Sequence, residues 1–300
     1  MVVKYLPKAI ANHQNMVRKI AQMDLPESET SFLRSSLGRT NSYEKGILGP
    51  MFYHLGGGSE HDLEALKDVG DCLWLIRVVD NVVDGHITGQ SMEPDARKLF
   101  LYGVADYISG ISDEKEFRKV VPKESGVLGA VEVAKFFKES LHDPPTLYFR
   151  ENLSLLARDT MGLPSTTIQD YENNLVAGGG GTGTLLLELV SGYPDFSHKD
   201  HETTRSFASD FGTLIQIADG LKDGDYCLSK YDNLRLAKSY WNRLKTYHDK
   251  EERFRTFERE AYLSIMALGL LGVRPYKILR NYSTHNIWSL TGEALGLPSK

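Results

Sequence analysis

Apolar residues recur along most of this sequence at steps of three and four, which is the spacing of one face of an α-helix. Between Gly126 and Leu141 they form one continuous stripe: Val127, Ala130, Val131, Ala134, Phe137 and Leu141. The alternation expected of β-strands is scarce. The pattern predicts an all-α protein, a bundle of about ten helices joined by short turns.

Helix starts are marked by an oxygen-bearing residue followed three positions later by an acid. The pairs are Ser59 with Asp62, Asp113 with Glu116, Thr167 with Asp170, and Ser197 with Asp200. No linker, repeat or charge block divides the 300 residues, of which 41% are hydrophobic and 25% charged. We therefore expect residues 1–300 to form a single domain.

Charge and cysteine content limit the partners and the compartment. Lys and Arg number 35 against 40 Asp and Glu, so the net charge of −5 offers no general attraction to nucleic acid. A phosphate-bearing ligand must therefore be held locally. Two unpatterned cysteines, Cys72 and Cys227, suit neither a disulfide framework nor a zinc site, which favours a reducing cytoplasm.

No segment predicts export or a membrane span. The N-terminus lacks the uninterrupted apolar stretch and small residues of a signal peptide. The most apolar run, residues 261–273 (AYLSIMALGLLGV), is shorter than the roughly 20 residues that cross a bilayer. It is interpreted as a buried helix, and peripheral contact with a membrane surface is the alternative.

Two strongly apolar segments are interrupted by pairs of aspartates. Asp80 and Asp84 are four residues apart in 72–84 (CLWLIRVVDNVVD), and Asp219 and Asp223 repeat this spacing in 211–223 (FGTLIQIADGLKD), so each pair shares one helix face. A buried carboxylate is costly unless it is paired with a cation or binds a metal. Carboxylates without nearby Cys or His suit Mg²⁺, often together with substrate phosphates. The alternative is salt bridges to neighbours such as Arg77 or Lys222.

The residues around both pairs resemble the aspartate motifs of class I isoprenoid synthases. Residues 77–84 (RVVDNVVD) are similar to the first motif of squalene and phytoene synthases. Residues 216–223 (QIADGLKD) resemble their second motif, which a glutamine also introduces, and 176–178 (VAG) resemble the Val-Ala-Gly helix of that family. The form D-N-x-x-D, with Lys45 and a glycine pair at 56–57 upstream, is also similar to the large bacterial terpene synthases related to tetraprenyl-curcumene synthase. The similarity spans residues 32–225.

This resemblance implies a single helical domain around a central apolar cavity, with three Mg²⁺ ions holding an allylic prenyl diphosphate at its mouth. The implied catalytic metal ligands are Asp80, Asp84, Asp219 and Asp223, with Asp225 as a further ligand and Asn81 as an auxiliary group. The implied substrate contacts are Lys45, Arg77, Gln216, Lys222, Tyr226, Lys230, Gly178 and Thr182. The metal stabilises the departing diphosphate, and a dry pocket protects the carbocation from water.

The implied activity is ionisation of the prenyl diphosphate, followed by coupling to a second prenyl unit or by cyclisation, with coupling favoured. Asn81 stands where chain-elongating synthases carry a second acid, and only Lys45 remains of their basic motif. A non-catalytic subunit that binds prenyl diphosphate is therefore an alternative. Homodimers are common among such synthases, and the substrate length, the product skeleton and any reductant stay open.

Two other motifs give competing hypotheses. Residues 178–183 (GGGGTG) fit the dinucleotide fingerprint G-x-G-x-x-G, but no strand precedes them. We expect instead a helix loosened beside the cavity, where substrate approaches the backbone, or else a tight helix–helix crossing. His-Asp dipeptides at 61–62, 142–143 and 248–249 suggest an all-helical His-Asp metal phosphohydrolase, a less favoured reading because two of them lie near turn signals.

Overall fold

The computed structural model describes residues 14–39, 52, 55, 63–85, 87–89, 91–122, 126–140, 167–191, 201–223 and 229–257. Helices dominate this part of the chain, and no strand occurs in it. The predicted all-α fold is thus confirmed for the described residues. None of their helices combines the length and apolarity needed to span a bilayer.

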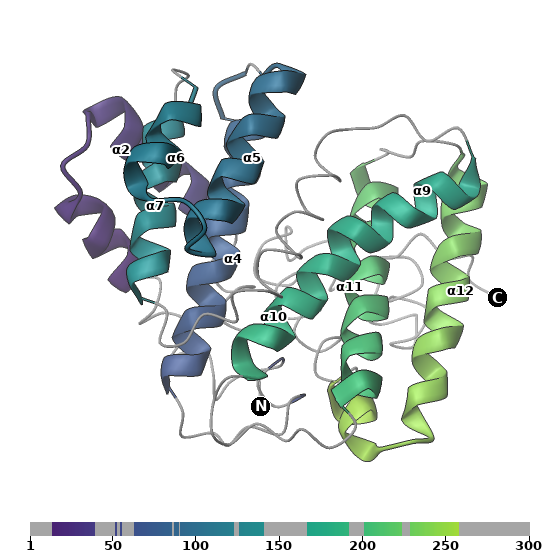
Figure 1. Cartoon of the computed structure of the whole chain (residues 1–300). Helices are drawn as coiled ribbons and strands as arrows, with labels where there is room; N and C mark the ends of the chain where they lie inside the picture. The colour runs from purple at the N-terminus through teal and green to yellow at the C-terminus, as the bar shows by residue number, and fades with distance from the viewer. Residues whose placement is uncertain are drawn as a thin grey trace, which may run out of the picture.

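The helices fall into two groups that meet at α4. In chain order they are α2 (Glu27–Arg39), α4 (Leu63–Val83), α5 (Pro94–Ile108), α6 (Glu114–Val120), α7 (Val127–Ser140), α9 (Ile168–Leu175), the π-helix η1 (Val176–Gly180), α10 (Gly181–Ser191), α11 (His201–Asp223) and α12 (Lys230–His248). Figure 1 shows α2 and α4 to α7 on one side and α9 to α12 on the other. Because α4 packs on α2 and α7 and also on α10, it joins the two groups.

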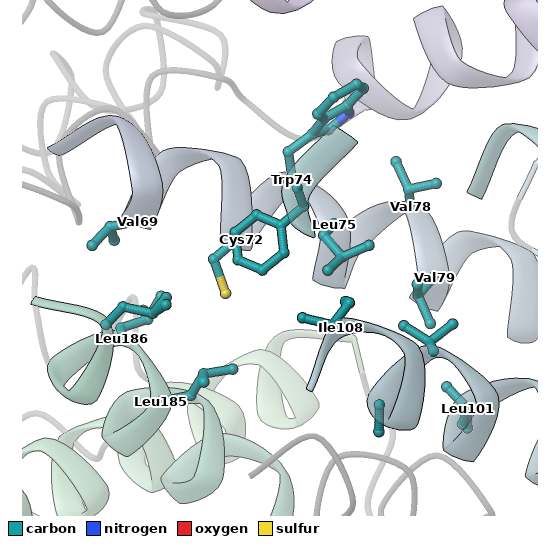
Figure 2. Packing of buried hydrophobic residues seen from close by; sticks show 14 of the residues in the cluster. Val69, Cys72, Trp74, Leu75, Val78, Val79, Leu101, Ile108, Leu185 and Leu186 are labelled. Atoms are coloured by element: carbon teal, nitrogen blue, oxygen red, sulfur yellow. The ribbon is translucent and has the colours of Figure 1, made fainter. Parts of the chain in front are cut away.

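Helix α4 carries much of the hydrophobic core. Figure 2 shows Cys72 facing Leu185 and Leu186 of α10, whereas Leu75 and Val79 lie on the side of α5. All five side chains are buried, and each contributes roughly 1.5–3 kcal/mol by leaving water. From Leu73 onward, the partly exposed residues of α4 and the first residue after it form one stripe along the remaining side: Leu73, Ile76, Arg77, Asp80 and Asp84. Packing therefore leaves the first acidic motif on the accessible side of this helix.

Two of the four predicted helix starts lie in the described part of the chain, and both are confirmed. Asp113 Oδ1 accepts a hydrogen bond from the Glu116 N–H at 2.8 Å, and Glu116 accepts one from the Asp113 N–H. Thr167 and Asp170 form the same reciprocal pair at the start of α9. The positions 59, 62, 197 and 200 lie outside the described residues. Each capping pair satisfies N–H groups that the first helical turn leaves free.

The start of α7 is capped by a residue far away in the sequence. The two carboxylate oxygens of Glu29, on α2, accept hydrogen bonds from the N–H groups of Gly126 and Gly129, both at 2.9 Å. Glu29 is buried, and its negative charge lies at the positive end of the helix. This contact ties α2 to α7.

Asp71, on α4, is a buried acid that makes folding depend on pH. The residue is 1% exposed, and its nearest cation in the described chain is the Lys67 amine at 3.7 Å. Burial raises the pKa of Asp71 to about 6, because desolvation outweighs the attraction of Lys67 and Lys19. The folded protein therefore binds a proton at pH values where the unfolded chain has lost it.

We predict that this carboxyl lowers the stability of the protein as the pH rises from about 4 to about 6. The pKa is higher in the folded state, so the folded state binds more protons in this window and the free energy of unfolding falls with rising pH. The shift from 3.8 to about 6 corresponds to about 3 kcal/mol. Asp71→Asn should remove this contribution to the decrease in the free energy of unfolding, as measured by urea unfolding at pH 4 and pH 7. Asp95→Asn, at an exposed position on α5, is the control. Parallel pH profiles for the parent and Asp71→Asn would contradict the prediction.

Candidate functional site

The first acidic motif lies at the C-terminal end of α4. Asp80 is in the last turn, and Asp84 follows the helix, with its N–H bonded to the Asp80 carbonyl at 2.9 Å. The side chains are 27% and 35% exposed, respectively. The helix is buried as expected, but these two carboxylates are within reach of solvent and of a ligand.

Each carboxylate has an arginine neighbour. Arg77 Nη1 donates to Asp80 Oδ2 at 2.9 Å, and Arg97 Nη1 lies 3.9 Å from Asp84 Oδ1. The salt-bridge alternative is thus present in the structure. The Arg77 side chain is 42% exposed, and an ion pair with this degree of exposure contributes only about 0–1 kcal/mol. Exchanging Arg77 for another cation at Asp80 would therefore cost little.

Arg97 also fixes the chain that leaves α4. It approaches the carbonyl oxygens of Val83 and Met92 at 3.4 and 3.5 Å, and the Met92 N–H donates to the Val83 carbonyl at 2.9 Å. Gly85 has a φ of 67°, a backbone conformation that favours glycine and ends the helix. Asp84 is held in a tight turn for this reason.

Asn81, expected as an auxiliary group beside the acids, lies in the core. It is 1% exposed, and its Nδ2 has no hydrogen-bond partner among the residues that the structure describes. Successive residues of an α-helix are rotated by about 100°, so the neighbour of a partly exposed residue can be fully buried. Asn81 therefore does not share the accessible side of α4 with Asp80 and Asp84.

The second motif lies in a helix, as predicted, and forms the C-terminal end of α11. The structure describes the backbone of Asp219 and Asp223 in the last turns of this helix. Gln216, at the start of the motif, is partly exposed and lies beside Gly179 of η1, where an added Cβ would stand 2.7 Å from the glutamine Oε1. The residue directly after the segment 176–178, which resembles the Val-Ala-Gly helix, is thus packed on the start of the second motif.

Several predicted site groups lie outside the described residues. These are Lys45, Asp225 and Tyr226, together with the side chains of Asp219, Lys222 and Asp223. Lys230 is exposed at the first position of α12. The convergence of four carboxylates therefore stays a prediction.

The glycine run combines both expected features, a loosened helix and a tight crossing. Residues 176–180 form a π-helix, a wide turn often found at functional sites. The Thr182 hydroxyl donates to the carbonyl of Gly178, which is buried, at 2.9 Å. An added Cβ at Gly179 would stand 2.5 Å from the Gly212 carbonyl oxygen, and one at Gly183 would meet the Ala208 carbonyl. At Gly179 and Gly183, α11 rather than substrate fills the space that glycine leaves.

No group of three or more His, Cys, Asp or Glu side chains within the described ranges is placed to hold a metal ion. Of the three His-Asp dipeptides, only 248–249 falls in these ranges, at the end of α12.

A surface pocket of about 260 Å³ is formed by the helical segment 14–22 with Met23 and by α7. Its lining residues are Lys19, Gln22, Met23, Glu132, Lys135, Phe136 and Glu139. Neither acidic motif contributes to it.

Comparisons with protein-family models, curated proteins and solved structures found no match.

Sequence reasoning missed the polar contacts that α12 makes with α11 and with α9. Asp210 is buried on α11, 2.6 Å from Arg243 Nη2 of α12, and it accepts a hydrogen bond from the Tyr247 hydroxyl at 3.1 Å. Burial raises the pKa of Asp210 despite the arginine, and burial beside Asp210 raises that of Tyr247 to about 12. The Tyr240 hydroxyl donates to Glu172 of α9 at 3.0 Å. The one sequence signal was an acid next to Phe211 in an apolar stretch. The bonds of Asp210 fix α12 against α11, the helix that ends in the second motif.

Proposed function

We propose that this protein is a Mg²⁺-dependent isoprenoid synthase that ionises an allylic prenyl diphosphate. The observation that carries the proposal is the packing of η1 on α11. The π-helix η1 begins with residues 176–178, which resemble the Val-Ala-Gly helix, and Gly179, directly after them, lies against Gln216 of the second motif. Helix α10 continues from this glycine segment and packs against both α4 and α11, the helices of the two acidic motifs. Segments far apart in the sequence are thus linked through one helix.

The chemistry of Asp80 and Asp84 fits Mg²⁺. Both offer hard oxygen donors on one accessible helix side, and Mg²⁺ typically takes one or two carboxylates and leaves its other positions to water and phosphate. Asp219 and Asp223, with Asp225, are the proposed ligands from the second motif. When bound, the metal supplies positive charge that stabilises the departing diphosphate.

The other proposed roles belong to side chains around the acids. Arg77, half-exposed beside Asp80, can donate hydrogen bonds to diphosphate oxygens as it now does to the carboxylate. Lys45, Lys222, Lys230 and Tyr226 are proposed as further contacts. We favour coupling to a second prenyl unit over cyclisation because the motifs resemble those of squalene and phytoene synthases most closely.

The proposal is tested by incubating the purified protein with Mg²⁺ and farnesyl or geranylgeranyl diphosphate. We expect pyrophosphate release that stops when the metal is chelated, and gas chromatography of the products would separate coupling from cyclisation. Mg²⁺ with pyrophosphate should also raise the melting temperature, because a ligand that binds the folded state stabilises it. A raised melting temperature without turnover would favour the non-catalytic subunit. If no prenyl diphosphate, of whatever prenyl chain length, gave pyrophosphate release, and Mg²⁺ with pyrophosphate left the melting temperature unchanged, both the synthase and the non-catalytic subunit would be contradicted.

A further inference from the structure

The outward side of α12 carries a basic and aromatic stripe. Its residues follow one another at steps of four and three and are all exposed: Tyr231, Arg235, Lys238, Asn242 and Lys245. We call these five residues the outer stripe. At 1.5 Å per residue, the stripe extends for about 21 Å along the helix.

The opposite side of α12 is fixed to the body of the protein. Its buried residues are Asn233, Leu236, Ala237, Tyr240 and Leu244. The helix packs on α11 and lies at the edge of its group in Figure 1. The outer stripe is therefore presented on a rigid helix and faces away from the core.

The charge of α12 is opposite to that of the whole chain. Residues 230–248 contain five Lys and Arg and one Asp, a net charge of +4, whereas the chain carries −5, so the rest of it carries −9. The single acid, Asp232, accepts a hydrogen bond from the Ser229 hydroxyl at 2.6 Å at the helix start. Within the described part of the chain, no carboxylate forms an ion pair with Arg235, Lys238 or Lys245. These cations are available to an external anion.

Aromatic rings accompany the cations. Tyr231 is 75% exposed at one end of the stripe. Near the other end, Trp241 is partly exposed beside the stripe, with the Lys245 amine 5.5 Å from its ring centroid. Tyrosine and tryptophan together with lysine and arginine are the residues that settle at the headgroup level of a bilayer.

We propose that the outer stripe of α12 docks on a bilayer surface rich in anionic phospholipids. A flat lipid surface meets only the outermost side of a helix, which is where Arg235, Lys238 and Lys245 lie. A nucleic acid reaches further over the protein, where the net charge of −9 would repel it. The proposal is independent of the proposed catalytic function.

The test is sedimentation of the full chain with vesicles of phosphatidylcholine alone or mixed with phosphatidylglycerol. We expect binding to the mixed vesicles that weakens with added salt, because exposed charges are screened. Each basic residue near such a surface contributes about fivefold, so R235E/K238E/K245E should weaken partitioning by about 100-fold or more. The matched control, K98E/K115E/K119E, reverses three exposed lysines on α5 and α6 and should bind within about threefold of the parent.

Circular dichroism would be used to check that both triple variants keep the helical content of the parent. Absence of parental binding to the mixed vesicles at low salt would overturn the proposal, as would equal losses in the two triple variants. The assignment to lipid would also be overturned if the parent bound an RNA duplex but not the mixed vesicles, and if R235E/K238E/K245E abolished that RNA binding.

Discussion

Asp80→Asn is expected to lower turnover of a prenyl diphosphate by about two to four orders of magnitude while the fold stays intact. A metal ion that neutralises a leaving group supplies several kcal/mol of transition-state stabilisation, and each factor of ten corresponds to about 1.4 kcal/mol. The amide oxygen that replaces the carboxylate is a weaker, uncharged ligand. The loss of the partly exposed pair with Arg77 should cost less than about 1 kcal/mol of stability. Asp219→Asn should behave in the same way.

The matched control is Glu114→Gln on α6. Glu114 forms an ion pair with Arg118 at 2.7 Å and a second one with Lys135 at 3.4 Å, is more exposed than Asp80, and belongs to neither motif. We expect this variant to keep parental turnover and nearly parental stability. Pyrophosphate release and thermal unfolding would be measured on the same preparations. Turnover of Asp80→Asn within tenfold of the parent would defeat the assignment of Asp80 as a metal ligand.

The features predicted well from the sequence are local ones. The apolar stripe of residues 127–141 predicted α7, which spans Val127–Ser140, because the helical period is contained in the segment itself. The capping pairs at Asp113 and Thr167 were recognisable because both partners lie within four residues. The aspartate spacing likewise predicted that Asp80 and Asp84 share one side of α4.

The features that escaped prediction depend on residues distant in the sequence. Nothing near Gly126 indicates that Glu29, 97 positions earlier, caps α7. Which side of α4 stays accessible is decided by the packing of α2, α7 and α10 on it, and this packing separates the partly exposed Asp80 from the buried Asn81. The sequence also left open whether the glycines of residues 178–183 expose their backbone to substrate or allow a close helix–helix crossing. Only the position of α11, which packs on them, decides between the two.

Gly212→Ala is expected to destabilise the protein by about 1–2 kcal/mol. Alanine has a higher helix propensity than glycine, which favours the variant by up to about 1 kcal/mol. Against this, the new Cβ would meet the Gly179 carbonyl oxygen and stand 2.9 Å from its carbon, and backbone atoms in two packed helices cannot rotate aside as a side chain can. Overpacking of this kind costs about 1–3 kcal/mol and sometimes more, so the steric cost should prevail. Urea unfolding gives the difference directly.

Gly129→Ala is the control that separates steric cost from propensity. Its added Cβ would lie 3.0 Å from Leu33 Cγ, a side-chain atom that can shift, so we expect a change near zero. Gly179→Ala crowds the same contact as Gly212→Ala; once one substitution has pushed the helices apart, the second should cost less, and the double variant should lose less stability than the sum. Additive losses, or a Gly212→Ala variant as stable as Gly129→Ala, would show that the helices do not touch there. Because Gln216 lies one turn after Gly212, the same displacement would move the second acidic motif relative to η1.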